Sequence, residues 1–527
     1  MSQITVSNLT FCYEGSYDNI FEDVSFQIDT DWKLGFIGRN GKGKTTFLRL
    51  LQETTKSDKW DNKYEYTGSI SASTAFDYFP YEVKKEQEDL SAAELFEILR
   101  PGCEFWRVLR ELEQLVLEPE CMYRPFCTLS HGERTKAMLA LLFSQENFFL
   151  LIDEPTNHLD AEARRVVRDY LKSKKGFILV SHDRELLDAC IDHVLVLNRA
   201  SIQVEKGNFS TWWENKERLD SFHQGENEKH LREIRQLKTA ADRAGRWADK
   251  NENTKIGFDP VKEHDRSKDT RAYIGAKTKK MQSRVKNLEN RIQSEITEKE
   301  GLLLDIERPV DLKLEALDFH KETYVFVRDM TLGYGGEPVL RSLNFELRRG
   351  ERVLLKGANG SGKSSLIKAV LERADADVLR TAGGSEKGGE WEPVLEGTLE
   401  VPAGLKISYV SQDTSRLRGS LEDLARERGL EESLLKALLR QLDFERVQFD
   451  KRMEDYSEGQ KKKVLLAASL LTSAHLYIWD EPLNFIDIFS RMQLEKLILK
   501  YRPTMLLVEH DAVFGERVST RVFELNP

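Results

Sequence analysis

Hydrophobic and polar residues follow patterns that predict several β-strands in the first part of the chain. Apolar and polar positions alternate over residues 4–13 and again over 24–28, as in strands with one buried face. Short apolar runs at 33–37, 148–152 and 177–180 are typical of strands buried inside a sheet. Because helical segments separate these strands, the pattern predicts an α/β fold.

The same order of elements then appears a second time. The alternating segment at residues 325–334 echoes the one around Tyr13, and the apolar run at 352–356 precedes a glycine-rich loop like the one after residue 37. A further apolar run at 476–480 corresponds to 148–152. A repeat of this length predicts two similar domains in tandem.

The segment between the two repeats has a helical pattern instead. Apolar residues at helical spacing run from Leu231 to Ala248, stop at a Gly/Pro-marked stretch over 253–260, and resume from Met281 to Ile296. Two helices around such a loop form a long hairpin. We therefore expect three parts: domain one over residues 1–215, a helical hairpin linker over 216–315, and domain two over 316–527.

Composition excludes several classes of protein. The chain has 527 residues, which is too long for one ordinary domain. No run approaches the ~18 to 20 uncharged apolar residues that span a bilayer, and the first residues lack the pattern of a signal peptide. We expect a cytoplasmic protein. Five cysteines, never spaced as C-x-x-C, argue against a disulfide framework or a zinc site and are interpreted as buried thiols: Cys12, Cys103, Cys121, Cys127 and Cys190.

Charge singles out the linker. The whole chain has a formal net charge of -10, which disfavours nucleic-acid binding over the general surface. Nevertheless, lysine and arginine strongly outnumber acidic residues between Arg266 and Arg291. The alternative is a solvated coiled-coil face, whose charges need no partner. The contrast with the rest of the chain makes this basic stretch the first candidate for contact with a polyanion.

Candidate chemistry starts at the loop after residue 37. Residues 38–45 match G-x-x-x-x-G-K-[ST] between an apolar run and a helix, the context of a phosphate-binding loop. Backbone N–H groups and the helix N-terminus would hold the phosphates of ATP, Lys44 would reach the β and γ phosphates, and Thr45 would bind Mg²⁺. The predicted ATP contacts are Gly38, Arg39, Asn40, Gly41, Lys42, Gly43, Lys44, Thr45 and Thr46, and in the second repeat Gly357, Ala358, Asn359, Gly360, Ser361, Gly362, Lys363, Ser364 and Ser365.

Two more elements would complete each site. Asp153 and Glu154 end the run at 148–152, where a parallel strand delivers carboxylates to the edge of a sheet. Asp153 would hold Mg²⁺ and Glu154 would act as the base for the attacking water, since phosphoryl transfer needs a positioned base and neutralised charge. His182 follows the strand at 177–180 and would bond a phosphate. The counterparts in the second repeat are Asp480, Glu481 and His510, with Ser364 as the hydroxyl ligand.

The order of phosphate loop, Ser-x-Gly turn, Asp-Glu strand and histidine strand resembles that of ATP-binding-cassette (ABC) ATPases. The resemblance implies that Tyr13 and Tyr334 stack on adenine. It also makes the turns Ser130-His-Gly132 and Ser457-Glu-Gly459 signature motifs. Two positions depart from the family pattern: His131 replaces a glycine, and Tyr81 stands where a glutamine normally contacts Mg²⁺. The second repeat has that glutamine, as Gln412.

In this family, each nucleotide lies between two cassettes. The resemblance therefore implies that Ser457 and Gly459 complete the site built on Lys44, and that Ser130 and Gly132 complete the one on Lys363. ATP would join the halves and hydrolysis would release them, a bistable switch biased by contacts to the γ-phosphate. The chain is expected to be a monomer with its two cassettes paired internally.

Three kinds of ABC protein compete as interpretations. A transporter motor has two cassettes but no use for a basic hairpin, and DNA-maintenance ATPases carry very long coiled coils or zinc-bearing inserts. Tandem cassettes joined by a helical hairpin resemble the ABC-F group, as does the segment Gly207–Trp213. This implies a hairpin in the exit-tRNA site of the bacterial 70S ribosome, near 23S rRNA and P-site tRNA. Its candidate RNA contacts are Arg266, Lys268, Arg271, Lys277, Lys279, Lys280 and Arg284.

One further feature bears on the role within the group. The segment Asp480–Glu495 departs from the Asp-Glu-Pro-Thr-Asn-His-Leu-Asp of the first repeat, and in this it resembles antibiotic-resistance ABC-F proteins of the Lsa and Vga type. The resemblance implies target protection against lincosamides, streptogramin A compounds and pleuromutilins. The acting part would be the hairpin loop at about residues 251–270. Alternatives are a housekeeping ABC-F translation factor and the ATPase subunit of a transporter.

Overall fold

A computed structural model of the protein describes most of both cassettes and the first part of the linker. By its contacts the chain separates into two compact units, Met1–Trp212 together with Val310–Pro527, and Trp213–Pro309. The described residues are 3–13, 19–39, 41–54, 66–157, 159–198, 201–253, 286–287, 291, 314–334, 337–358, 360–374, 394–442, 444, 446–484 and 486–525.

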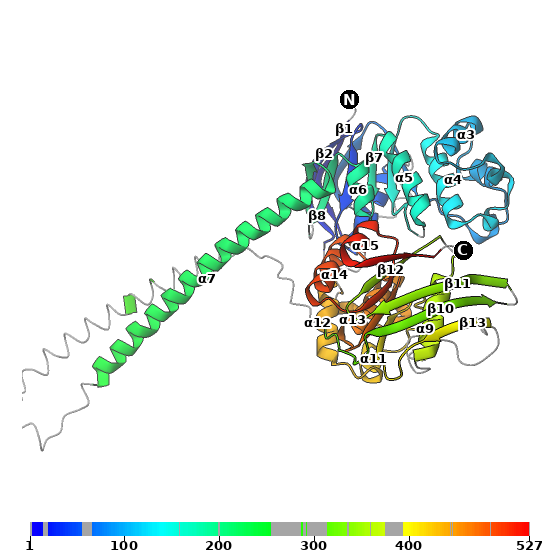
Figure 1. The fold of residues 1–527 in the computed structure, drawn as a ribbon. Helices are drawn as coiled ribbons and strands as arrows, with labels where there is room; N and C mark the ends of the chain where they lie inside the picture. The colour runs from blue at the N-terminus through cyan, green and yellow to red at the C-terminus, as the bar shows by residue number, and fades with distance from the viewer. Residues whose placement is uncertain are drawn as a thin grey trace, which may run out of the picture. The chain divides into compact units, whose positions relative to one another are not determined.

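A six-stranded sheet forms the centre of the first cassette. Its order is β5-β6-β7-β3-β8-β9, and every pair is parallel except β8 with β9. The predicted buried strands are confirmed, because their apolar runs lie inside this sheet (Figure 1). The strands are β3 (Lys33–Ile37), β5 (Ala75–Phe79), β6 (Phe148–Asp153), β7 (Phe177–Val180), β8 (His193–Asn198) and β9 (Ser201–Lys206).

An antiparallel sheet of three strands packs near this central sheet. Its order is β2-β1-β4, and the alternation that predicted β1 places Ile4, Val6 and Leu9 in the core. These side chains share one apolar cluster with Phe36 of β3 and Phe47 of α1. Burial of this cluster fixes the helix that follows the phosphate loop against both sheets. The elements are β1 (Gln3–Phe11), β2 (Phe21–Asp29), β4 (Tyr66–Ala72) and α1 (Lys44–Glu53).

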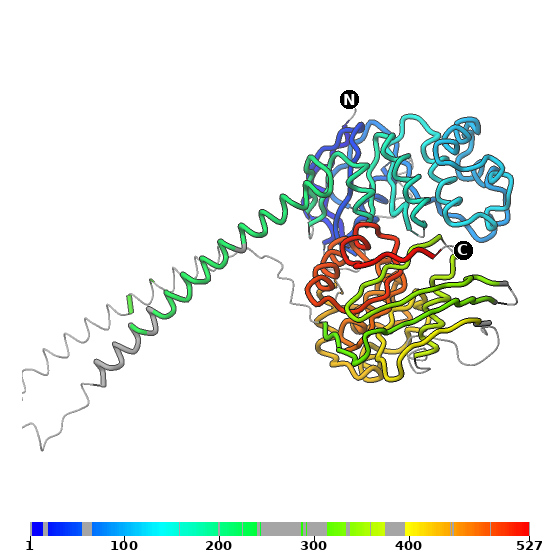
Figure 2. Tube along the Cα trace, viewed as in Figure 1, coloured from blue at the N-terminus to red at the C-terminus, as the bar shows by residue number. Residues whose placement is uncertain are grey.

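Helices complete the first cassette, and the chain's order can be followed by colour in Figure 2. Helix α4 contacts α3 and β5, while α5 contacts α6. Helices α2, α3 and α4 and the short 3₁₀ turns lie between β5 and β6 along the chain. The helices are α2 (Ala92–Leu99), α3 (Phe105–Gln114), α4 (His131–Phe143), α5 (Ala161–Ser173) and α6 (Arg184–Cys190), with short 3₁₀ turns at Lys85–Gln87, Pro119–Tyr123 and Phe126–Thr128.

The second cassette repeats this topology. Its parallel sheet has the order β14-β15-β16-β12-β17, which matches β5-β6-β7-β3-β8, and its antiparallel sheet has the order β11-β10-β13. The predicted tandem repeat is therefore confirmed. The strands are β10 (Thr323–Tyr334), β11 (Glu337–Arg348), β12 (Arg352–Lys356), β13 (Val394–Glu400), β14 (Ile407–Val410), β15 (Leu476–Asp480), β16 (Met505–Val508) and β17 (Arg521–Glu524).

The helices of this cassette also correspond to those of the first. Helix α9 follows the phosphate loop as α1 does, and α13 follows the Ser457 turn as α4 follows Ser130. They are α9 (Lys363–Ala374), α11 (Leu421–Glu427), α12 (Glu432–Gln441), α13 (Glu458–Leu471), α14 (Ile488–Tyr501) and α15 (Ala512–Val518), with 3₁₀ turns at Arg446–Gln448 and Met453–Asp455.

The linker begins with one continuous helix, α7 (Phe209–Asn253) (Figure 1). It contains the apolar residues from Leu231 to Ala248 that predicted a helix, which confirms the first arm of the predicted hairpin. The loop that follows lies outside the described residues, as do all seven candidate RNA contacts from Arg266 to Arg284. Searched over the described residues, the chain has no helix that is both long enough and apolar enough to cross a membrane.

The interpretation of all five cysteines as buried thiols is wrong in part. Cys121 and Cys190 are buried, and burial raises the pKa of the Cys190 thiol to about 12. Cys12 and Cys127 are exposed, and Cys103 is partly exposed. Cys12 follows the end of β1 and Cys127 lies in the 3₁₀ turn Phe126–Thr128, and at both places the apolar character of a cysteine does not decide burial. All five are free thiols, as expected.

Candidate nucleotide sites

The first phosphate loop has the backbone that its glycines permit. It leads from β3 into α1, and Gly43 caps the helix with a φ of 101°. A side chain at Gly43 would start 2.4 Å from a methyl carbon of Ile20, so both the conformation and the space require glycine. The loop wraps the Lys44 ammonium, which donates to the carbonyl oxygens of Gly38 at 2.6 Å and Arg39 at 3.0 Å. A buried cation at a helix N-terminus is an anion site.

Asp153 is held at the end of β6 by two hydroxyl groups. Its Oδ2 accepts from Thr45 Oγ1 at 2.7 Å and from the hydroxyl of Tyr78 at 3.1 Å. Burial raises the pKa of this carboxyl group, against the effect of both hydrogen bonds. Hydroxyl and carboxylate oxygens are the ligands that Mg²⁺ prefers. The residues predicted to bind the metal in the first site are thus adjacent.

Glu154 and His182 meet at the ends of neighbouring strands. Glu154 adopts a left-handed backbone with a φ of 49°, and its Oε1 lies 3.2 Å from Nε2 of His182. Burial and the nearby Asp153 raise the pKa of Glu154. Burial and the nearby Lys44 lower the pKa of His182, so its imidazole is neutral at pH 7. The carboxyl group and the histidine therefore lie next to each other and near the Lys44 ammonium.

Tyr81, which replaces the glutamine of the family, takes part in a different cluster. Its hydroxyl donates to Asp77 at 2.7 Å, and Asp77 also pairs with Arg100 at the end of α2. The tyrosine that contacts Asp153 is instead Tyr78, which lies in β5. Tyr81 thus connects the chain after β5 with Asp77 of β5, which pairs with the end of α2.

The second site has the same parts with a different hydrogen-bond pattern. Lys363 donates to Gly357 and Ala358 at 2.8 and 2.7 Å. Asp480 is buried, which raises its pKa to about 6, and its Oδ1 has no hydrogen-bond partner. An unpartnered buried oxygen beside the Ser364 hydroxyl is suited to a hard cation. The donor set therefore fits Mg²⁺ here as well.

Glu481 has more partners than Glu154. Its Oε2 accepts from Gln412 Nε2 and from Asn484 Nδ2, both at 2.8 Å, and its Oε1 lies 3.4 Å from Nε2 of His510. Burial raises the pKa of this carboxyl group, but these partners outweigh it and the pKa of Glu481 is lowered overall. The two predicted bases are thus held differently, and the glutamine is one cause.

This difference predicts unequal effects on ATP turnover from substitutions at the corresponding positions 412 and 81. In a Glu154→Gln protein, where only the second site keeps its predicted base, Gln412→Ala removes a donor that orients Glu481 and should lower the remaining ATP turnover by about ten- to a hundredfold. Tyr81→Phe removes a hydroxyl that contacts Asp77 and should leave turnover close to that of the parent. Steady-state phosphate release from both variants measures this. Equal losses would show that Tyr81 has taken over the role of the glutamine.

The two Ser-x-Gly turns are helix N-termini, as expected. Ser130 caps α4 and its hydroxyl oxygen accepts from the backbone N–H of Glu133 at 3.2 Å. Ser457 caps α13 in the same way, with Gln460 as the donor at 3.3 Å. In each capping box the serine accepts, so its own proton can still be donated to a phosphate oxygen.

Charged side chains of each cassette affect the pKa of the phosphate-loop lysine in the other cassette. Burial lowers the pKa of Lys44, while Asp487 of the second cassette, Glu154 and Asp153 oppose the shift. Asp160 of the first cassette acts on Lys363 in the same sense. These influences agree with the predicted pairing of the cassettes. Completion of the Lys44 site by Ser457 and Gly459, and of the Lys363 site by Ser130 and Gly132, remains a prediction.

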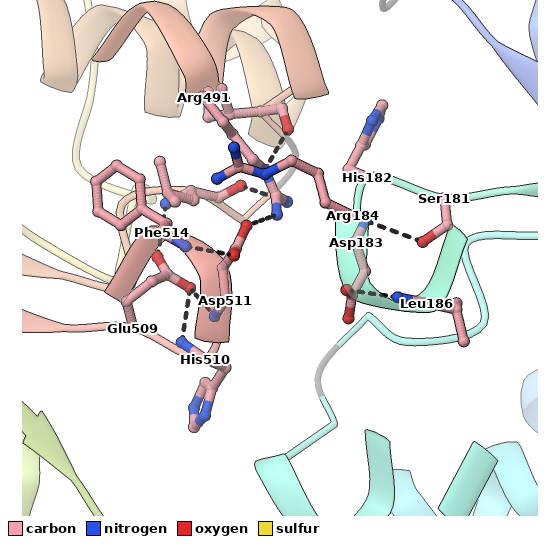
Figure 3. A network of polar contacts seen from close by, with 12 residues as sticks. Ser181, His182, Asp183, Arg184, Leu186, Arg491, Glu509, His510, Asp511 and Phe514 are labelled. Atoms are coloured by element: carbon pink, nitrogen blue, oxygen red, sulfur yellow. Dashed lines mark hydrogen bonds and ion pairs between the residues drawn. The ribbon is translucent and has the colours of Figure 1, made fainter. Parts of the chain in front are cut away.

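Sequence reasoning missed two arginines that contact the aspartates directly after His182 and His510. Arg491 donates to Asp511, next to His510, at 3.0 Å and to the carbonyl oxygen of Ile486 at 2.9 Å (Figure 3). Arg164 donates to Leu159 O at 3.0 Å and lies 3.5 Å from Asp183. Both arginines occupy the same place after the acid pair, so comparison of the repeats could have found them.

Of the other predicted ATP contacts, Tyr13 lies beside the first phosphate loop. Its hydroxyl shares a 2.6 Å hydrogen bond with Thr46 Oγ1, and its side chain is 44% exposed. The side chain of Tyr334 and the residues Asn40 and Asn359 lie outside the described part. Arg39, Gly41 and Lys42 lie in the first loop, and Gly360, Ser361, Gly362 and Ser365 in the second loop or the start of α9.

Comparison with known proteins defines the class. The profile of the family described as "ABC transporter" matches residues 21–157 and 340–484, which together are more than half of the chain. The chain therefore belongs to the ABC transporter family, and it is an ATPase with two ATP-binding cassettes. The predicted resemblance to the ABC-F group is confirmed by the relatives that match it.

Three relatives match almost the whole chain. The "Ribosome protection protein VmlR" of Bacillus subtilis is 27% identical over 98% of this chain and 85% of its own length. The "Erythromycin resistance ATP-binding protein MsrA" of Staphylococcus epidermidis is 27% identical over 94% of this chain and 92% of its own. The "ABC transporter F family member 2" of Arabidopsis thaliana is 23% identical over 99% of this chain and 76% of its own.

A solved structure confirms the fold. The archaeal ribosome recycling factor aABCE1, solved in complex with the ribosomal stalk protein aP1, aligns with 98% of this chain and 87% of its own. The TM-score is 0.57 at 19% sequence identity. At this identity the likeness concerns the fold alone.

Proposed function

We propose that the protein is a cytoplasmic ATPase that binds the bacterial ribosome and protects it from antibiotics that act at the peptidyl-transferase centre. The observation that carries this proposal is near full-length similarity to VmlR and MsrA, whose names state ribosome protection and erythromycin resistance. The tandem cassettes and the long helix α7 support this proposal, because a linker that is attached to a cassette at each end moves when the cassettes close. The drugs we expect are lincosamides, streptogramin A compounds and pleuromutilins.

ATP would close the cassettes in the following way. At the first site Lys44 and the loop N–H groups bind the β and γ phosphates, and the Ser457 turn binds the γ-phosphate from the other side. Glu154 then orients the attacking water, and the neutral His182 donates a hydrogen bond to the γ-phosphate. The second site would use Lys363, Glu481, His510 and the Ser130 turn in the same roles. Loss of the γ-phosphate removes the contacts that hold the cassettes together.

Mg²⁺ would be held by Thr45 and Asp153 in the first site, and by Ser364, Gln412 and Asp480 in the second. When bound, Mg²⁺ neutralises negative charge on the phosphate oxygens. The protein's own contribution is the rigid placement of these oxygens, because each aspartate ends a central strand of its sheet.

The linker would carry the effect to the ribosome. Its basic stretch would neutralise rRNA phosphates, and its loop at about residues 251–270 would enter the exit-tRNA site and reach toward P-site tRNA and the drug site. Helix α7 has 45 residues. At about 1.5 Å per residue, a helix of this size is roughly 65 to 70 Å long.

Inhibitory drug concentration in a susceptible bacterium measures this function. Cells that express the chain should grow at higher concentrations of at least one of the three drug classes, while cells that express a Lys44→Ala/Lys363→Ala variant should not. Drug accumulation in the cells should be equal in both cases, because the target is protected and the drug is not exported. Lower accumulation would favour the ATPase subunit of a transporter. Ribosome binding without any change in inhibitory concentration would favour a housekeeping translation factor.

A further inference from the structure

One buried ion pair joins the first cassette to the second. Arg184 is the first residue of α6 and follows the His182-Asp183 turn, while Glu495 lies in the middle of α14. Arg184 Nη2 donates to Glu495 Oε2 at 2.8 Å. The two residues are 4% and 5% exposed. A pair that is removed from water in this way is held in one geometry, unlike a pair on the surface.

Glu495 has a further partner in the second cassette. The second carboxylate oxygen of Glu495 accepts from Arg517 Nη1 of α15 at 2.8 Å. Glu495 lies one helical turn after Arg491, which is bonded to Asp511 and to the loop before α14. Figure 3 shows Arg184 extending from the turn of His182 toward Arg491. The pair therefore connects the histidine turn of the first site with the helix that braces the histidine turn of the second.

The pair is present on one side of the internal repeat only. When Asp153 is aligned with Asp480, Glu495 corresponds to Arg168. When His182 is aligned with His510, Arg184 corresponds to Ala512. A methyl group and a guanidinium cannot form the reciprocal ion pair. Arg168 pairs within its own cassette, with Asp169 at 3.1 Å and with Glu185. The two halves are thus chemically unequal at this contact.

We propose that Arg184 and Glu495 form a one-sided link between the cassettes and act as positioning residues for hydrolysis at the first site. Arg184 is two residues from His182, whose Nε2 lies 3.2 Å from Glu154 Oε1. Fixing the start of α6 to α14 fixes this histidine relative to the second cassette, which would supply Ser457 and Gly459. At the second site the corresponding Ala512 leaves His510 without such a link. This proposal rests on the assignment of Glu154 and His182 to the first ATP site.

A double-mutant cycle on ATP turnover tests the pairing. In a Glu481→Gln protein, where only the first site keeps its predicted base, Arg184→Gln and Glu495→Gln should each lower kcat by about tenfold, because a small displacement of positioned groups is costly, and the double variant should be no slower than the slower single one. The KM for ATP should stay within about twofold, since no predicted nucleotide contact changes. Arg168→Gln is the matched control at the corresponding position and should keep the parental kcat. Unchanged kcat in either single variant, or losses that multiply in the double variant, would overturn the link.

Single-site parents test the one-sidedness. Arg184→Gln should slow the remaining turnover of a Glu481→Gln protein, in which the first site is intact, and should have no effect in a Glu154→Gln protein. Equal slowing in both parents would contradict a role confined to the first site. If Glu154→Gln by itself leaves turnover unchanged, the site assignment fails and the proposal fails with it, which distinguishes that result from failure of the link alone.

A conservative variant separates positioning from folding. Arg184→Lys keeps the charge at the buried position and should retain more kcat than Arg184→Gln, whatever the effect of the glutamine variant on thermal unfolding. If Arg184→Lys melts like the parent and yet is as slow as Glu495→Gln, the ion pair is not what positions the site, and the proposal is contradicted.

Discussion

A Glu154→Gln/Glu481→Gln variant should bind ATP as the parent does, hydrolyse it far more slowly, and remain bound to ribosomes. A positioned base contributes about 10² to 10⁴ per site, and both bases are lost in this variant. Glutamine has nearly the shape of glutamate, so the cassettes should still close around ATP. Phosphate release and sedimentation with 70S ribosomes in ATP measure the two effects.

The control for this ribosome-bound variant is one whose cassettes cannot close around ATP. Lys44→Ala/Lys363→Ala removes both buried ammonium groups from the phosphate loops and should fail to sediment with ribosomes in ATP. The account would be contradicted by a double glutamine variant that hydrolyses slowly but stays in the supernatant. In that case ATP-driven closure would not be coupled to the ribosome.

Replacement of residues 251–270 by a glycine-serine segment of the same length should abolish drug protection and preserve ATP hydrolysis. None of the predicted ATP-site residues lies in this segment, so the cassettes should turn over as before. Protection should disappear because the acting end of the linker is gone. Inhibitory concentration and phosphate release, measured on the same variant, separate the two functions.

A second linker variant serves as the control for affinity. Replacement of Lys277, Lys279 and Lys280 by glutamine keeps the loop and removes charge from the basic stretch. Its binding to ribosomes should weaken and should become less dependent on salt, because fewer phosphates are neutralised. If the loop replacement protects as well as the parent, the loop has no part in the mechanism.

Local patterns predicted the elements of the sites well. Apolar runs at β3, β6 and β7 gave the central strands, because burial in a parallel sheet leaves little choice of residue type. The glycines of the phosphate loop are equally restrictive: Gly43 needs both its positive φ and the absence of a side chain. Chemistry that depends on consecutive residues can be read from the sequence.

Contacts between distant residues could not be predicted in this way. Tyr81 occupies the place of a glutamine, but its hydroxyl binds Asp77, while Tyr78 contacts Asp153. These contacts join separate elements, since Asp153 ends β6 and Asp77 also pairs with Arg100 at the end of α2. The Arg184–Glu495 pair joins residues from different repeats, and only the tertiary structure brings them together. The exposure of Cys12 and Cys127 was missed because residue type is a weak guide to burial outside the central strands and helices.

The central claim is that ATP-bound cassettes place the linker in the exit-tRNA site of the ribosome. A structure of the Glu154→Gln/Glu481→Gln protein with ATP on the bacterial 70S ribosome measures this directly. We predict the segment 251–270 beside P-site tRNA, with the basic stretch from Arg266 to Arg291 against 23S rRNA. A linker that lies outside the exit-tRNA site, with both nucleotides bound, would contradict the account.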